Sequence, residues 1–250
     1  MPPPITLFIQ PGFQVPGRSR CFSGTPFAIK VQRILQYKRL PFVVREVGWL
    51  ERAELLPKIS RSQKLPVLQY GDQLVEDSTA IAYYLEERHP EPALVPADPR
   101  ARARVHFVEE WADEVLYWYG IYEAARFGSF EVQTEAYYRD LPETVRRVAT
   151  ERMRAAVAEA LDRQGIGRYP PEKVMADVRR GLDALASLIG ADGFVGGAVL
   201  TLADLAVFGQ LHRRMAGTHP WLEGEIEHRP ALRAWVARVD ALSGGAGSSA

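Results

Sequence analysis

The spacing of apolar and polar residues predicts strands in the first third of the chain. Residues 5–9 and 42–47 are short runs rich in β-branched and aromatic side chains, which is typical of strands. Residues 65–70 and 73–77 form a second pair of such runs, separated only by Gly71-Asp72. Because this dipeptide favours a tight two-residue turn, we predict a β-hairpin there.

Helices alternate with these strands. Apolar residues recur at mostly helical spacing over residues 26–35, until Leu40-Pro41 ends the pattern. Residues 77–90 predict a second helix with a polar cap and a proline at its end, whereas residues 50–60 predict a weak helix or an irregular segment. The order β-α-β-α-β-β-α predicts a compact α/β unit.

Beyond this unit the pattern becomes that of helices alone. Residues 91–100 are rich in proline and have the composition of an interdomain linker. Helical periodicity then continues over residues 100–127, 141–165, 170–190, 201–215 and 229–242. We therefore predict an α/β domain at residues 1–90, an all-helical domain at 101–243 and a disordered, Gly/Ser-rich tail at 244–250.

Composition and charge exclude several classes of function. The chain of 250 residues is 47% hydrophobic and 25% charged, as in a globular protein, and its 31 basic residues balance 31 acidic ones. No overall field therefore attracts nucleic acid, and no apolar run approaches the ~18 residues of a membrane span. The N-terminus lacks the pattern of a secretory signal and the single cysteine suits a reducing compartment, so we expect a cytoplasmic protein. The histidines do not cluster with cysteine or carboxylates at metal spacings, and we expect no metal site.

Three separated stretches carry a resemblance to a known family. Residues 25–42 (TPFAIKVQRILQYKRLPF), 64–90 (KLPVLQYGDQLVEDSTAIAYYLEERHP) and 194–211 (FVGGAVLTLADLAVFGQL) are similar, in this order, to the glutathione S-transferase superfamily. They resemble its first βα turn, its cis-proline strand with the glutathione-binding helix, and the buried helix of its C-terminal domain. The resemblance implies an α/β thioredoxin-like N-terminal domain, an all-α C-terminal domain, and a homodimer that uses glutathione as co-substrate.

The resemblance also implies which residues bind glutathione. The peptide bond between Leu65 and Pro66 is expected to be cis, so that the backbone of Leu65 pairs with the cysteinyl part of glutathione like an added strand. Ser78 and the start of its helix would bind the γ-glutamyl carboxylate, and Asp77 the ammonium group. The family usually has Glu or Gln in place of Asp77, and often a polar residue at Lys64 near the ligand. Without a ligand, Asp77-Ser78 is a helix cap and Lys64 a solvated side chain.

Thr25 directly precedes Pro26, at a position where the family commonly has Ser or Cys. A threonine before a proline in the first helical position is a good N-cap and needs no ligand. The same hydroxyl, at the positive end of the helix, would stabilise the glutathione thiolate and lower the pKa of the thiol. Thr25 is therefore the predicted catalytic residue, and Ser23 is the alternative hydroxyl.

The loop at residues 11–24 is longer than in most members of the family and resembles that of metaxin-like and bacterial relatives. Its Phe13 is a candidate wall residue of a pocket for the electrophile, or alternatively a residue that fills and blocks the site. Trp111, Tyr119 and Tyr122 of the aromatic-rich helix after the linker are further candidates. Such aromatic density is otherwise typical of a core or a dimer contact.

The predicted activity is attack of the glutathione thiolate on an apolar electrophile, a detoxification reaction that needs no metal. Two alternatives remain open. Thr25, Asp77 and the long loop are also compatible with a non-enzymatic binding or scaffold protein, and Cys21 with a glutathione-dependent thiol oxidoreductase. Thr201 and Asp204 have the form of a capping box, and we expect them to support folding, not chemistry.

Overall fold

A mixed four-stranded sheet organises the N-terminal part of the protein. The computed structural model describes residues 3–127, 134–135, 137–138, 141–189 and 193–244. The elements of the N-terminal part are β1 (Ile5–Ile9), α1 (Pro26–Tyr37), β2 (Val43–Glu46), α2 (Trp49–Ile59), β3 (Val67–Tyr70), β4 (Gln73–Glu76) and α3 (Ser78–Arg88). The strand order is β2-β1-β3-β4, with β1 parallel to β2 and antiparallel to β3. This is the thioredoxin-like architecture expected from the sequence.

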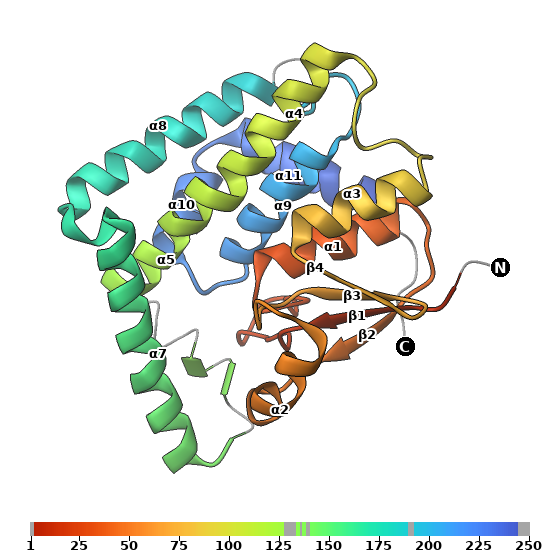
Figure 1. Cartoon of the computed structure of the whole chain (residues 1–250). Helices are drawn as coiled ribbons and strands as arrows, with labels where there is room; N and C mark the ends of the chain where they lie inside the picture. The colour runs from red at the N-terminus through yellow and green to blue at the C-terminus, as the bar shows by residue number, and fades with distance from the viewer. Residues whose placement is uncertain (1–2, 128–133, 136, 139–140, 190–192, 245–250) are drawn as a thin grey trace.

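Alternation of side chains along β1 separates two apolar layers. Leu7 and Ile9 belong to the main core with residues of α1 and α3, whereas Phe8 packs with Leu56 of α2 in a smaller cluster. Figure 1 accordingly shows α1 and α3 above the sheet and α2 below it. α2 is a regular helix, although the sequence also allowed an irregular segment; its Pro57 lies near the helix end and burial of Leu56 adds to the weak local preference.

β3 and β4 form the predicted hairpin. Tyr70 pairs with Gln73 on either side of the turn, and Gly71 has a φ of +60°, a conformation that favours glycine. The hairpin leads directly into α3, so the edge of the sheet and the N-terminus of this helix lie close together.

Helices make up the described C-terminal part. They are α4 (Pro99–Trp111), the π-helical η1 (Ala112–Leu116), α5 (Tyr117–Arg126), α7 (Glu143–Gln164), the 3-10 turn η2 (Ile166–Arg168), α8 (Pro171–Ile189), α9 (Leu202–Arg214), α10 (Pro220–Glu227) and α11 (Pro230–Ser243). The π-helical turn η1 interrupts what the sequence predicted as one continuous helix, and α10 was not predicted because it spans only 8 residues. The tail beyond residue 244 lies outside the described residues. Within them, no helix is both long enough and apolar enough to span a bilayer.

α9 connects the two parts of the structure. It packs along α1, and a β-carbon added at Gly209 would lie 2.6 Å from the carbonyl oxygen of Pro26, so glycine permits the close approach. The predicted capping box is present: Asp204 accepts hydrogen bonds from the backbone N–H of Thr201 (2.9 Å) and from the indole of Trp235 (3.1 Å). The start of α1, where Thr25 lies, is therefore held against a helix that is buried at all but one of its residues.

Candidate functional site

Thr25 lies where two cavities meet. It is the N-cap of α1, and its Oγ1 accepts a hydrogen bond from the backbone N–H of Ala28 at 3.3 Å, as the sequence predicted for a cap. One cavity, of about 330 Å³, extends from Thr25 toward Lys64 and Leu65; we call it the outer groove. The other, of about 220 Å³, extends toward α5, α7 and the end of α9; we call it the inner cavity. Gln10, Thr25, Phe27 and Tyr117 border both.

Ser23 and Cys21, the other two candidates near the start of α1, are turned into the protein. Both are fully or almost fully buried. The Ser23 hydroxyl donates to the carbonyl of Gln10 at 2.8 Å and accepts from the N–H of Thr25 at 3.2 Å, so it braces the loop. Burial raises the pKa of the Cys21 thiol, which donates to the carbonyl of Ser23 at 3.3 Å. A buried thiol with a raised pKa lacks the accessible thiolate that an oxidoreductase needs.

The outer groove brings together some of the residues expected to bind glutathione. The Leu65–Pro66 bond is cis, as predicted, and Lys64 and Leu65 line the groove with Thr25. Arg52 of α2 lines it as well, and the sequence motifs did not point to this residue.

Asp77 and Ser78 lie at the N-terminus of α3 and are not among the residues that line the groove. Asp77 is the N-cap: its Oδ1 accepts from the N–H groups of Thr79 and Ala80, each at 3.0 Å. Its φ of +74° is rare outside glycine and turns the chain from β4 into the helix. Ser78 is almost fully buried at the first helical position. The cap geometry therefore holds, and a ligand role for this pair stays a prediction.

A buried ionic network ties α3 to the groove. The ammonium of Lys30 in α1 donates to Asp113 Oδ2 at 2.7 Å, to Thr79 Oγ1 at 3.1 Å and to Glu109 of α4. Burial by itself would lower the pKa of Lys30, but the two carboxylates outweigh it and raise this pKa. For Asp113, burial has the larger effect and raises the pKa, although the nearby charge of Lys30 acts to lower it. Asp113 lies in the π-helical turn and also lines the groove, so the network couples the start of α3 to the site.

One group of potential metal ligands lies beside this network. Among the described residues, ligand atoms of His106, Glu109 and Glu110 come within 4.8 Å of one another. Glu109 already accepts from the Lys30 ammonium, whose charge opposes a second cation at the same carboxylate. The group therefore does not form a prepared metal site.

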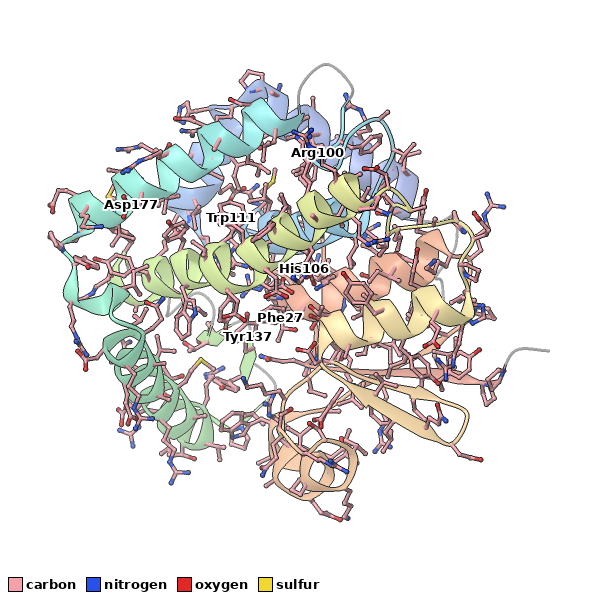
Figure 2. All side chains as sticks on the ribbon, turned by 45° about the horizontal axis from the view of Figure 1, so that its top comes forward. Phe27, Arg100, His106, Trp111, Tyr137 and Asp177 are labelled. Atoms are coloured by element: carbon pink, nitrogen blue, oxygen red, sulfur yellow. The ribbon has the colours of Figure 1, made fainter. Side chains whose placement is uncertain are left out.

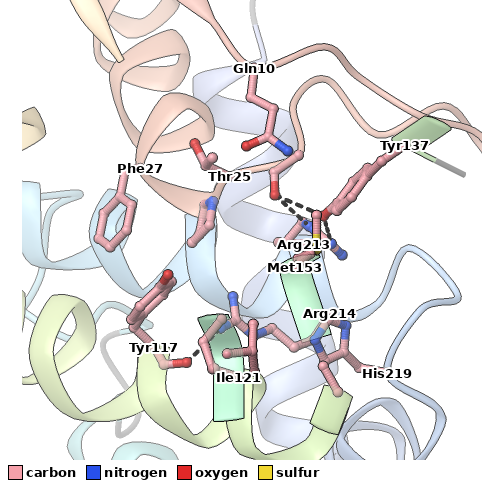
Figure 3. A pocket seen from close by; sticks show the side chains of 14 residues that line it. Gln10, Thr25, Phe27, Tyr117, Ile121, Tyr137, Met153, Arg213, Arg214 and His219 are labelled. Carbon is pink, nitrogen blue, oxygen red and sulfur yellow. Dashed lines mark hydrogen bonds between the residues drawn. The ribbon is translucent and has the colours of Figure 1, made fainter. Parts of the chain in front are cut away.

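The inner cavity has one apolar wall and one basic wall. Ile121 of α5 and Met153 and Val157 of α7 are apolar, while Arg213 and Arg214 at the end of α9 are charged. Figure 3 shows Thr25 and Gln10 on one side of this space and Tyr117 and Ile121 facing them, with Arg213 next to Tyr137. The cavity suits a ligand that combines an apolar body with polar or charged groups.

The four residues proposed for an electrophile pocket do not line the inner cavity. Phe13 is fully buried behind it, in edge contact with Tyr137 at a centroid distance of 5.2 Å. Tyr122 is buried with its hydroxyl donating to the carbonyl of Tyr169, and Tyr119 borders a separate surface cavity between α5 and α8. Trp111 points from α4 toward α8, where it contacts Gly181 (Figure 2).

The residues of the helix that do line the cavity form a different face. Tyr117, Ile121 and Ala124 follow one another at helical spacing on α5. This spacing was visible in the sequence, but several faces of the helix are equally aromatic. Arg213 and Arg214 carried no signal, because basic residues at the end of a helix are ordinary.

A thioredoxin-like domain, followed by a helical domain that packs on the start of α1, defines the class of glutathione transferase-type proteins. Family models of the glutathione S-transferase N-terminal and C-terminal domains match residues 22–93 and 147–238. The chain belongs to the glutathione S-transferase superfamily.

Individual relatives agree with this assignment. Human glutathione S-transferase theta-2 is 29% identical over 75% of this chain. The matched segments span between 36% and 64% of the length of the first curated relatives. Among solved structures, the β-etherase LigF of Sphingobium superposes with a TM-score of 0.68 at 21% identity, covering 95% of both chains. A glutathione transferase homologue from Sulfitobacter with bound glutathione superposes with a TM-score of 0.59 at 19% identity, over 95% of this chain and 93% of that one.

Proposed function

We propose that the protein is a glutathione transferase that binds glutathione in the outer groove and an electrophile in the inner cavity. The observation that carries this proposal is the position of Thr25, a helix N-cap that borders both spaces. The thiol of a glutathione molecule bound in the outer groove would, beside Thr25, also face the inner cavity. The homologue from Sulfitobacter, which holds glutathione on the same fold, supports the choice of ligand.

The chemistry follows from the cap geometry. Thr25 Oγ1 uses a lone pair to accept from Ala28, so its hydrogen remains available to donate to sulfur. This donor and the positive end of α1 favour the thiolate and lower the pKa of the thiol. The thiolate then forms a carbon–sulfur bond with the electrophile, whose leaving group departs with the bonding electron pair; the thiol proton goes to solvent.

The remaining contacts place the rest of glutathione. The backbone of Leu65 would pair with its cysteinyl unit, and Lys64 would approach one of its carboxylates. Ser78 and the N-terminus of α3 would take the γ-glutamyl carboxylate. Because both helix N–H groups bond to Oδ1 of Asp77, Oδ2 is the oxygen left for the γ-glutamyl ammonium.

The test is calorimetric titration of glutathione into the wild type, Ser78→Ala and, as a matched control, Ser187→Ala. Ser187 is an exposed serine on α8 that bonds within its own helix. We expect binding in the micromolar-to-millimolar range that Ser78→Ala weakens at least tenfold, about 1.4 kcal/mol, and Ser187→Ala leaves unchanged. No heat at millimolar glutathione would refute the transferase and favour the non-enzymatic binding protein.

We also propose that the protein is a cytoplasmic homodimer with a role in detoxification. β4, α3 and α4 each carry an exposed apolar side chain: Leu74 is 46% exposed, Tyr83 38% and Phe107 74%. Light scattering should give a dimer for the wild type and for Leu50→Glu, on the far side of the sheet, but a monomer for Phe107→Glu. A monomeric wild type would contradict the proposal.

A further inference from the structure

Two consecutive arginines form the basic wall of the inner cavity. Arg213 and Arg214, the last residues of α9, are 3% and 2% exposed. Both line the cavity: Arg214 lies next to α5, whereas Arg213 reaches the carbonyl of Gly24 beside Thr25 (Figure 3). Burial of two guanidinium groups side by side is unfavourable unless something compensates their charge.

The partners of Arg213 are neutral. Its donors reach the carbonyl of Gly24 at 3.1 Å, the hydroxyl of Thr218 at 2.5 Å and the hydroxyl of Tyr137. Burial raises the pKa of Tyr137, so this phenol stays uncharged at neutral pH. These contacts orient the guanidinium without neutralising it.

Arg214 is less completely bonded. It donates to the carbonyls of Gln210 at 3.2 Å and Tyr117 at 3.1 Å, while its buried Nε has no hydrogen-bond partner among the described residues. Neither arginine forms an ion pair with any Asp or Glu that the structure describes. Burial and the neighbouring charge of Arg213 lower the pKa of Arg214 to about 10, which leaves it charged at neutral pH.

The titratable groups around the pair leave a net positive charge. Glu123 of α5 acts on Arg214 through space, but both its oxygens bind N–H groups of Trp221 and Leu222. Burial raises the pKa of Glu123 to about 7, so this carboxyl carries only part of a charge at neutral pH. Burial lowers the pKa of His219, which lines the cavity, well below its usual value, so it is neutral.

Gly120 makes room for the Arg214 guanidinium. A β-carbon at this position would overlap Nε and one terminal nitrogen of Arg214, so the guanidinium lies directly on the backbone of α5. The guanidinium is thus held in a fixed place at the cavity wall.

We propose that the inner cavity binds an anionic second substrate, a small aromatic or short-chain carboxylate whose acid group pairs with Arg214 and Arg213. Its apolar body would contact Ile121 and Met153, and its electrophilic carbon would face the thiol beside Thr25. A volume of about 220 Å³ lies below the usual range of drug-sized sites, which favours a small acid. The claim that the acid is a substrate rests on the proposed transferase function. The claim that the acid binds in the inner cavity does not depend on that function.

The first test needs no variant and no glutathione. Calorimetry compares 3-nitrobenzoate with 3-nitrobenzamide, which have similar shapes and differ in charge. We expect the acid to bind at least tenfold more tightly at low ionic strength, and added salt to reduce this preference. Equal affinities, or tighter binding of the amide, would overturn the proposal.

Variants then locate the site. Arg214→Met and Gly120→Ala, which displaces the guanidinium, should abolish the preference for the acid, whereas Arg233→Met, a 62% exposed arginine on α11, should keep it. A preference that survives in folded Arg214→Met or Gly120→Ala refutes the assignment.

Turnover with glutathione separates this inference from the proposed function. The electrophiles are chloronitrobenzoate, with chlorine para to the acid group and ortho to the nitro group, and the matching amide; in both, sulfur replaces chloride. The Michaelis constant for the acid should rise at least tenfold in Arg214→Met, while that for the amide changes little. Acid binding without glutathione binding would refute the transferase alone, and the converse would refute this inference alone.

Discussion

Replacing Lys30 by methionine removes a positive charge from between two buried carboxylates and keeps a side chain of similar length. The ammonium contacts Glu109 and Asp113, which are 0% and 9% exposed, and also the hydroxyl of Thr79. These partners belong to α4, the π-helical turn and α3, whereas Lys30 belongs to α1. The change therefore acts on contacts that join the sheet domain to the helical domain.

The expected cost is large because the carboxylates cannot reach water. Removing one partner of a buried ion pair typically lowers the free energy of unfolding by about 3–5 kcal/mol, a large share of the ~5–15 kcal/mol of a whole domain. The cost should depend on pH. Burial already raises the pKa of Asp113, and without Lys30 little opposes it. When the pKa of a carboxyl is higher in the folded than in the unfolded state, the free energy of unfolding falls as pH rises. The stability of the variant should therefore be closest to that of the wild type at acidic pH.

Urea unfolding followed by tryptophan fluorescence measures this effect, since the chain has five tryptophans. Wild type, Lys30→Met and Lys30→Met/Asp113→Asn are compared at pH 8 and pH 5.5. The second substitution removes one uncompensated charge and should restore at least about 1 kcal/mol at pH 8. Lys58→Met is the control, because Lys58 is 62% exposed in its ion pair with Glu54 and should change stability by no more than about 0.5 kcal/mol.

Two outcomes would refute the reasoning. A loss below about 1 kcal/mol in Lys30→Met would mean that the carboxylates find water or other partners without the ammonium. A double variant no more stable than the single one would mean that the destabilisation comes from packing of the methionine and not from charge.

Three further predictions concern single side chains. Glu123 has a pKa of about 7 in the folded protein against an ordinary 4.5, so the folded state loses stability as this carboxyl ionises between these two pH values. Glu123→Gln should remove this loss, which is at most about 3 kcal/mol, from the pH dependence of the free energy of unfolding. An unchanged pH dependence would contradict the raised pKa. Thr25→Ala should cost about 1 kcal/mol of stability and raise the pKa of the bound glutathione thiol, read from thiolate absorbance, whereas Thr25→Ser restores both; an unmoved thiol pKa would leave Thr25 a cap alone. Asp204→Ala should lower the free energy of unfolding by more than about 3 kcal/mol because it frees the N–H groups of Val195 and Thr201 and the Trp235 indole, while glutathione affinity of the folded protein stays the same; weakened affinity would show that Asp204 does more than support folding.

The parts of the fold that the sequence predicted well are those determined by local chemistry. Thr25 before Pro26 predicted the start of α1, Gly71-Asp72 predicted the hairpin turn, and Thr201 with Asp204 predicted the start of α9; each is present. A cap or a tight turn depends on residues within three or four positions of one another, so the sequence contains all that determines it. The short helix α10 and the π-helical turn depend on packing with distant elements, and neither was predicted.

The same distinction between local and long-range determinants applies to the candidate site. Thr25, Lys64 and Leu65 were found because they belong to contiguous motifs, and the structure brings them to one groove. The inner cavity is assembled from α5, α7 and α9, whose facing side chains are far apart in the chain. Arg213 illustrates the difference. In the sequence it is an ordinary basic residue at the end of a helix and does not indicate a binding site. Only the structure shows that it is buried beside Arg214 with neutral hydrogen-bond partners, and this arrangement suggests a role in binding an anion. Sequence motifs therefore indicated where we propose that glutathione binds, whereas the proposed chemistry of the second substrate depends on the charges that folding brings together.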